Sequence, residues 1–234
     1  MLGIIGGMGP LASSLFYDMI TEKTKARRDQ DNLDLILLSH ASMPDRTAAI
    51  LSGDPEQVAD VKEKLLVDAT YLAKSGCTAL AVTCNTAHYF IDMIEKEVPV
   101  PFIHLIRETG AELARKCPGE RVAILATDGT IKTGLYQKEF ARRGIEAYVP
   151  LASVQEKVMK EIYEHVKSGI PADPDMWQEI EQAVKEAGCK AAILACTELS
   201  VVRVQLQLGD FYFDPMEIMA DRCIDFFRAS GEIK

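Results

Sequence analysis

The chain has 234 residues, of which 48% are hydrophobic, and it carries a formal net charge of −9. This length is enough for one large domain or two small ones, and the composition is typical of a globular enzyme with a real core. The acidic balance argues against nucleic-acid binding, which usually needs a basic face, and no apolar run approaches the roughly 20 residues that span a bilayer.

Short apolar runs alternate along the chain with amphipathic segments, which is the order of elements in parallel α/β folds. In the first half we expect strands at 2–5, 33–38, 79–83 and 102–104, and helices at 11–26, 55–74, 88–97 and 108–116. The cycle then restarts, with strands at 122–126, 147–150, 191–195 and 211–213, and helices at 134–143, 155–167, 175–187 and 216–228. The sequence therefore predicts an α/β fold in which parallel sheets are flanked by helices.

An internal repeat indicates two similar halves. Residues 76–84 resemble residues 188–196, and both cysteines of each segment recur at a spacing of 112 residues. Shorter matches align 3–6 with 123–126 and 102–106 with 213–217. We expect the last segment to cross back to the first half. The predicted domains are therefore 1–100 plus 211–234, and 101–210.

The six cysteines form no CxxC pair, and the four histidines are scattered. The N-terminal residues lack the basic segment of a secretory signal, so we expect a cytoplasmic chain whose thiols are reduced. A structural zinc site needs closely spaced ligands, so we expect no metal.

Two of these cysteines lie where parallel sheets bind ligands, at the carboxyl ends of strands. Cys84 precedes Asn85 and Thr86, and Cys196 precedes Thr197 and Glu198. Backbone N–H groups at a helix start attract anions and lower the pKa of a nearby thiol. If the halves face each other, a ligand carboxylate is held between the two turns with a thiol on each side.

Three uses of this cysteine pair stay open on the residues alone. Inverting an α-carbon requires a base on one face and an acid on the other, which two pseudo-symmetric thiols supply. A reversible disulfide is the second use, in a redox-sensing binding protein. The third is packing, because buried cysteines often behave as small hydrophobic residues.

Five motifs, in this order along nearly the whole chain, resemble the aspartate/glutamate racemase family, most closely the aspartate racemases. The motifs are Gly6-Gly7-Met8-Gly9-Pro10, Pro44-Asp45-Arg46-Thr47, Cys84-Asn85-Thr86-Ala87-His88, Thr127-Asp128-Gly129-Thr130 and Cys196-Thr197-Glu198. The resemblance implies two α/β domains with the active site in the cleft between them, and racemisation of a small acidic amino acid without a cofactor. It also implies a homodimer. Related isomerases, decarboxylases and hydantoin racemases share the fold and remain the alternative.

The resemblance also assigns roles to residues. It makes Cys84 and Cys196 the acid/base pair, and it places Arg46 and Lys167 on the acidic groups of the substrate. The α-carboxylate or ammonium group is expected to contact Asn85, Thr86, Thr127 and Thr197.

Simpler roles compete with several of these assignments. Arg46 could form a surface ion pair with Asp45, and Lys167 could complement a helix end. The glycine loop around Met8 does not match a dinucleotide-binding spacing, so we expect its backbone to approach a small substrate. Glu198 is expected to orient or polarise Cys196. His88 follows Cys84 by about one helical turn and either tunes the thiol or caps the helix.

Overall fold

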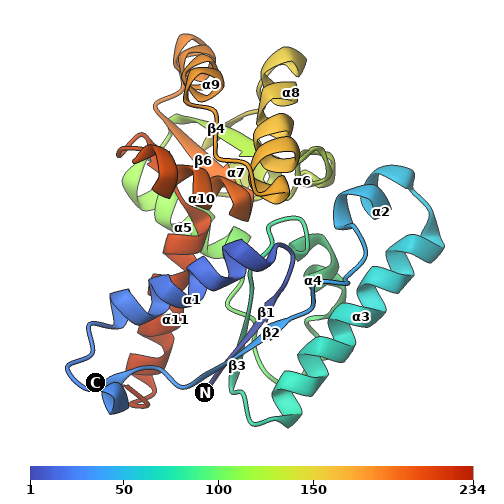
Figure 1. The fold of residues 1–234 in the computed structure, drawn as a ribbon, viewed down its shortest axis with the longest axis vertical. Coiled ribbons are helices and arrows are strands. Elements are labelled where there is room, and N and C mark those ends of the chain that lie inside the picture. Colours follow the sequence, from blue (N-terminus) through green and yellow to red (C-terminus); the bar gives the residue numbers. More distant parts are fainter. Residues whose placement is uncertain (234) are drawn as a thin grey trace.

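The computed structural model describes residues 1–233 and contains two parallel β-sheets, one in each half of the elongated molecule, with helices packed around them (Figure 1). The predicted α/β fold class is therefore confirmed. Within these residues, no helix combines the length and the apolar composition needed to cross a membrane.

The first sheet contains β1 (Leu2–Gly6), β2 (Leu35–Ser39) and β3 (Ala79–Val82) in the order β2-β1-β3. The strand expected at 102–104 is reduced to one bridge, in which Phe102 lies beside Leu80. The preceding residue, Pro101, accepts a hydrogen bond from the Leu80 N–H but has no N–H to donate, which shortens the ladder.

The second sheet contains β4 (Arg121–Ala126), β5 (Glu146–Tyr148), β6 (Ala191–Ala195) and β7 (Tyr212–Phe213) in the order β5-β4-β6-β7. This order repeats that of the first sheet, with β7 in the place of the Phe102 bridge. The repeat is one residue out of step there, because Tyr212 rather than Phe213 pairs with Ala192, the counterpart of Leu80.

Seven helices lie close to their expected positions, and their bounds are α1 (Pro10–Thr24), α3 (Pro55–Lys74), α4 (His88–Ile94), α5 (Leu105–Lys116), α7 (Leu135–Arg142), α9 (Pro174–Glu186) and α11 (Pro215–Ala229). The helix expected at 155–167 is divided into α8 (Ala152–Lys160), a π-helical turn (Glu161–His165) and a 3₁₀ turn (Val166–Ser168).

The sequence did not predict three helices and a short 3₁₀ turn at Asp29–Asp31. The helices are α2 (Arg46–Ser52), α6 (Asp128–Thr133) and α10 (Thr197–Leu206), and each begins within one of the quoted motifs. Asp45 and Thr127 cap α2 and α6 by accepting backbone N–H groups, and Cys196 occupies the N-cap position of α10. When the first turn of a helix consists of polar capping residues, the spacing of apolar residues that identifies a helix is absent there.

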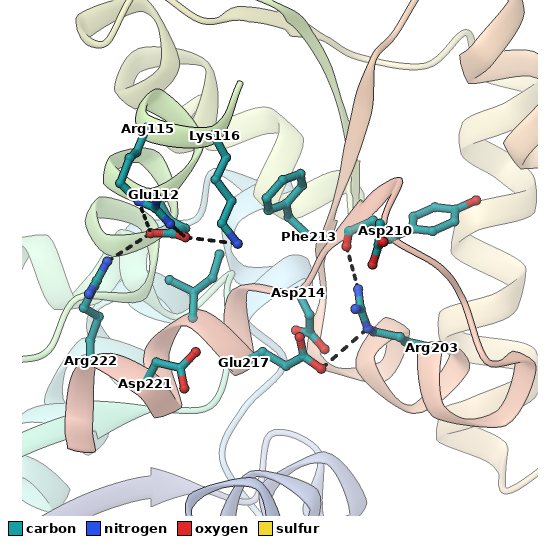
Figure 2. Close-up of a pocket in the computed structure, with 12 residues that line it drawn as sticks. Glu112, Arg115, Lys116, Arg203, Asp210, Phe213, Asp214, Glu217, Asp221 and Arg222 are labelled. Atoms are coloured by element: carbon teal, nitrogen blue, oxygen red, sulfur yellow. Dashed lines mark hydrogen bonds and ion pairs between the residues drawn. The ribbon is translucent and has the colours of Figure 1, made fainter. Parts of the chain in front are cut away.

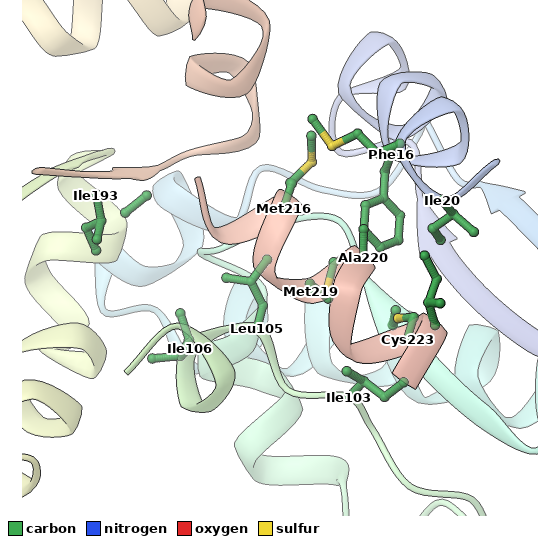
Figure 3. Close-up of a cluster of buried hydrophobic side chains, with 14 of the residues drawn as sticks. Phe16, Ile20, Ile103, Leu105, Ile106, Ile193, Met216, Met219, Ala220 and Cys223 are labelled. Atoms are coloured by element: carbon green, nitrogen blue, oxygen red, sulfur yellow. The ribbon is translucent and has the colours of Figure 1, made fainter. Parts of the chain in front are cut away.

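Alternate residues of each central strand face different cores, as the period of a strand requires. Ile4 and Ile124 join one large cluster that contains residues of both sheets, whereas Ile5 and Leu125 join two separate outer clusters. Helices α1, α5 and α11 run through the shared cluster. Figure 3 shows Met216 and Met219 of α11 among side chains from these helices.

The last segment joins the two halves. Its strand β7 pairs with β6 of the second sheet, whereas α11 packs against α1 and α5. We had placed 211–234 with the first domain, and the pairing of β7 assigns that short strand to the second sheet instead. The division of the remaining chain into two domains stays a prediction.

A buried carboxylate lies at the start of α11. Asp214 caps this helix by accepting the Met216 N–H at 2.8 Å, and it accepts the Ser200 hydroxyl at 2.9 Å. Both bonds go to Oδ1, and Oδ2 has no hydrogen-bond partner among the described residues. Burial raises the pKa of Asp214 to about 6 from an ordinary value of 3.8.

Replacing Asp214 by asparagine is expected to stabilise the protein at pH 7 and to remove a pH dependence. The folded protein binds the proton of the Asp214 carboxyl group more tightly than the unfolded chain does. Protonation of Asp214 therefore stabilises the fold fully below about pH 4, and this contribution is lost as the pH rises through 6. Asparagine keeps the cap without the buried charge. We expect Asp214→Asn to raise the free energy of unfolding by about 2–3 kcal/mol more at pH 7 than at pH 4.

Urea denaturation of both proteins between pH 4 and 8 measures this difference. Asp173→Asn is the matched control, because Asp173 caps α9 in the same way from a partly exposed position. Parallel stability curves for the wild type and Asp214→Asn would contradict the expectation.

Candidate active site

The two repeated cysteines line one cavity between the halves of the molecule. Cys84 lies two residues after β3 ends, and Cys196 directly follows β6. Both positions are at the carboxyl ends of parallel strands, where an open parallel sheet binds its ligand. Each sheet therefore contributes one thiol to the same small space.

All ten residues that we predicted as catalytic or substrate-binding line this inner cavity, together with two that we did not. The lining consists of Met8, Arg46, Thr47, Cys84, Asn85, Thr86, Thr127, Tyr163, Lys167, Cys196, Thr197 and Glu198. The cavity volume is about 10 Å³. That is room for about one water molecule, so a bound amino acid requires the walls to move apart.

Cys196 lies beside an anion. Its thiol donates a hydrogen bond to Oε2 of Glu198 at 2.9 Å, and Oε1 of Glu198 accepts from Nζ of Lys167 at 2.5 Å. Burial, followed by the Glu198 charge, raises the pKa of Cys196 well above its ordinary value. We had expected the helix start to lower this pKa, and for Cys196 that expectation is wrong because burial and Glu198 outweigh the backbone. Cys196 is a protonated thiol near neutral pH.

Cys84 instead lies beside a cation. Burial alone would lower the pKa of Arg46, but its interaction with the nearby Cys84 sulfur raises it. The guanidinium beside this sulfur is therefore charged. His88 bonds the backbone of Cys84 and not its thiol: Nδ1 donates to the Cys84 carbonyl at 2.8 Å, and Nε2 accepts the Leu105 N–H at 3.2 Å. Burial lowers the pKa of His88 to about 3, so the ring is neutral.

Four threonine hydroxyls form a network across the two halves. The hydroxyl oxygen of Thr86 lies 3.0 Å from that of Thr127 and 2.8 Å from that of Thr130, and Thr47 donates to Thr127 at 3.3 Å. Hydroxyl protons rotate to suit a partner, so such a cluster can turn donors towards an anionic ligand.

The Arg46 guanidinium is held by the loops around it. It donates to the carbonyl oxygens of Pro44 at 2.8 Å, Met43 at 3.3 Å and Met8 at 3.4 Å. Asp45, the suggested ion-pair partner, caps α2 instead. Arg46 is therefore built into the wall of the cavity rather than extended over the surface.

The glycine loop packs closely against Glu198. A side-chain Cβ at Gly9 would lie 2.9 Å from Oε1 of Glu198, which is too close for another residue without a shift. Beyond this loop lies an outer pocket of about 350 Å³, and Met8, Arg46, Tyr163, Lys167 and Glu198 line both spaces. These five side chains separate the inner cavity from the outer pocket.

A larger cleft lies elsewhere. Figure 2 shows this cleft of about 570 Å³ between α5, the segment around β7, and α11. Several of its charged groups already pair with one another, as Glu112 does with Arg115 and Arg222. None of the predicted site residues lines it. Within residues 1–233, no cluster of three or more His, Cys, Asp or Glu side chains is placed to hold a metal ion.

Sequence analysis missed Thr47 and Tyr163. Thr47 directly follows Arg46 in a motif that we had quoted, so its position was a usable signal. Tyr163 lies four residues before Lys167, but it belongs to the π-helical turn, whose geometry the sequence did not predict. Burial raises the pKa of Tyr163, so it lines the cavity as a neutral phenol.

Replacing Glu198 by glutamine is expected to lower the pKa of Cys196 towards the ordinary value of a thiol. Burial remains, but the negative charge that opposes the thiolate is gone. The expected result is that alkylation of Cys196 by iodoacetamide begins at a lower pH than in the wild type. Alkylation rates of the separate cysteine peptides, followed by mass spectrometry from pH 6 to 10, measure this shift.

Cys189 in the same sample is the internal control, since it is also buried but has no contact with Glu198. An unchanged profile for Cys196, or an equal shift for Cys189, would contradict the effect of the Glu198 charge.

Comparisons with known proteins identify the family of this chain. The family model described as Asp/Glu/Hydantoin racemase matches residues 5–223. The chain is 26% identical over 210 residues to the broad specificity amino-acid racemase RacX of Bacillus subtilis, covering 88% of this chain and 89% of that protein. It is 27% identical over 177 residues to a glutamate racemase of Aquifex aeolicus, covering 70% and 64%.

Solved structures of an aspartate racemase and of a homologue are also similar to this chain. The aspartate racemase of Picrophilus torridus is 27% identical, with a TM-score of 0.77 over 98% of this chain and 94% of that one. An aspartate racemase homologue from Pyrococcus horikoshii OT3 is 26% identical, with a TM-score of 0.76 over 96% and 97%.

Proposed function

We propose that this chain, which belongs to the Asp/Glu/Hydantoin racemase family, interconverts L- and D-aspartate, with Cys84 and Cys196 as the two acid/base groups. The amino-acid racemase activity follows from the family, whereas the substrate and the roles of the cysteines are our proposal. The observation that carries it is the pair of thiols in one cavity, with Arg46 beside one and Glu198 beside the other.

The two cysteines divide the proton transfers between them. One sulfur, as thiolate, removes the α-proton and becomes a thiol, while the other thiol gives its proton to the opposite face and becomes a thiolate. The raised pKa of Cys196 suits the donor of the first step, and the neighbouring cation suits Cys84 to be the base. In the reverse direction the roles are exchanged.

The acidic character of the substrate rests on the two cations. The net charge of −9 repels an acidic ligand at long range, so local positive groups must hold it. Arg46 offers a planar fork to a carboxylate. Burial alone would lower the pKa of Lys167, but the Glu198 carboxylate beside it opposes this and the pKa is raised. We assign Asn85, Thr86, Thr127 and Thr197 to the carboxylate and ammonium groups at the α-carbon.

Incubation with each enantiomer of aspartate in D₂O tests the proposal. We expect both enantiomers to reach the same racemic mixture, with deuterium at the α-carbon of the product. The same measurement with glutamate tests which of the two acids is preferred. They differ by one methylene, and a pocket can discriminate against such a difference by about 1–3 kcal/mol at most. No exchange with any amino acid would overturn the proposal, and turnover of another α-substituted dicarboxylic acid alone would favour a related isomerase or decarboxylase.

We further propose that the protein is a cytoplasmic homodimer. The six cysteines are all unpaired thiols, which suits a reducing compartment, and the homodimer rests on the family resemblance. Analytical ultracentrifugation of the purified protein tests the oligomeric state.

A further inference from the structure

The amide of Asn85 is only half satisfied. Asn85 is 2% exposed, lies next to Cys84, and lines the inner cavity. Its Oδ1 accepts a hydrogen bond from the Tyr136 hydroxyl at 2.6 Å, but its buried Nδ2 has no partner among the described residues. Buried polar groups are rarely left unpaired, so this nitrogen is a candidate contact for a ligand.

The group that holds this amide comes from the other half of the molecule. Tyr136 belongs to α7, beside the second sheet, and its side chain is completely buried. Burial raises the pKa of Tyr136 well above its ordinary value, so the phenol keeps its single proton and donates it to Asn85. The carbonyl side of the amide is thereby fixed towards Tyr136, and the amide nitrogen points away from it.

The orientation decides what Asn85 can bind. With its carbonyl committed to Tyr136, the side chain offers N–H donors to the cavity, beside the hydroxyls of Thr86 and Thr127. A rotated amide would instead present an oxygen and repel a carboxylate. A buried phenol in one half thus prepares a carboxylate contact in the other.

We propose that Tyr136 is a positioning residue, which sets the Asn85 amide for recognition of the substrate carboxylate. This inference rests on the proposed function. Tyr136 does not line the cavity itself, so its effect on the ligand passes through Asn85.

Binding of L-aspartate to a Cys84→Ser/Cys196→Ser background tests the proposal without turnover. Isothermal titration calorimetry is expected to show about tenfold weaker binding when Tyr136→Phe is added. The matched control is Tyr212→Phe, which removes another phenol bond, to Glu181 at 2.7 Å, between two residues that do not line the cavity. Its affinity should equal that of the background. In the active enzyme, Tyr136→Phe should raise KM about tenfold and change kcat much less.

Asn85→Asp, a nearly isosteric change, shows whether Tyr136 acts through Asn85. It replaces the N–H donors by an oxygen and should weaken binding at least as much as Tyr136→Phe. Adding Tyr136→Phe to Asn85→Asp should then cause no further loss. Additive losses, equal weakening by the Tyr212→Phe control, or unchanged affinity in Tyr136→Phe would each overturn the inference.

Failure of the proposed function looks different. In that case the unmodified enzyme would leave aspartate unchanged in D₂O and the background would not bind it, which overturns both proposals. Normal racemisation by the wild type together with unchanged affinity in Tyr136→Phe overturns this inference alone.

Discussion

Replacing either Cys84 or Cys196 by alanine is expected to lower the rate of racemisation by about 10²–10⁴-fold, the usual contribution of a positioned acid or base. Each variant keeps one thiol on one face of the α-carbon. That thiol can remove a proton and return a deuteron to the same face, so exchange without inversion should persist for one enantiomer. The retained enantiomer should be opposite in the two variants. NMR detection of α-deuterium in L- and D-aspartate measures this result.

The repeated partners of these cysteines provide matched controls. Cys77 and Cys189 lie at the other ends of the same strands and are buried outside the cavity. Alanine at either position should leave the racemisation rate close to that of the wild type. A rate near wild type in Cys84→Ala or Cys196→Ala, or exchange of the same enantiomer in both, would rule out a two-base mechanism.

Arg46→Ala is expected to lower kcat/KM for aspartate by about 10²–10³-fold, mainly through KM. Removing one partner of a desolvated charge pair typically costs about 2–5 kcal/mol, because the other charge is left without a counterion. Lysine should restore little, since an ammonium cannot reproduce the planar fork that the carbonyls of Met8 and Pro44 hold in place. Steady-state kinetics with both enantiomers measure the effect.

Arg142→Ala is the control for loss of one positive charge, because its side chain is 77% exposed and lies outside the cavity. Its kinetics should match the wild type at moderate ionic strength. If Arg46→Ala kept the wild-type KM, the assignment of this guanidinium to a substrate carboxylate would be wrong.

Sequence reasoning selected residues that line one cavity, but it predicted their electrostatics poorly. The repeat placed Cys84 and Cys196 at equivalent strand ends. The short motifs contain every residue that lines the inner cavity except Tyr163 and Lys167, although no role was predicted for Thr47 and Lys167 was assigned by the family resemblance. The pKa of Cys196 was predicted in the wrong direction. A general rule for helix starts does not include how deeply one thiol is buried or which oxygen of Glu198 faces it.

The remaining differences arise from contacts between distant parts of the chain. Tyr136 and Asn85 are 51 residues apart, and no local pattern predicts that a phenol of α7 reaches an amide after β3. Two other features depend on backbone hydrogen bonds rather than on the spacing of apolar residues. They are the single bridge at Phe102, where a strand was expected, and the helices that begin inside motifs. Strands and long helices were predictable because their apolar spacing repeats many times.

The packing of α11 has a consequence for protein synthesis. Phe16 and Ile20 of α1 are translated well before α11, yet α11 completes their apolar cluster. The apolar face of α1 must therefore stay uncovered until α11 has been translated. The ion pair between the Met1 amine and Glu232 at 2.6 Å brings the two ends together, so a linker joining them should allow new termini to be opened elsewhere in the chain. A circular permutant that begins at α11 would make this helix first and give α1 its partner during translation.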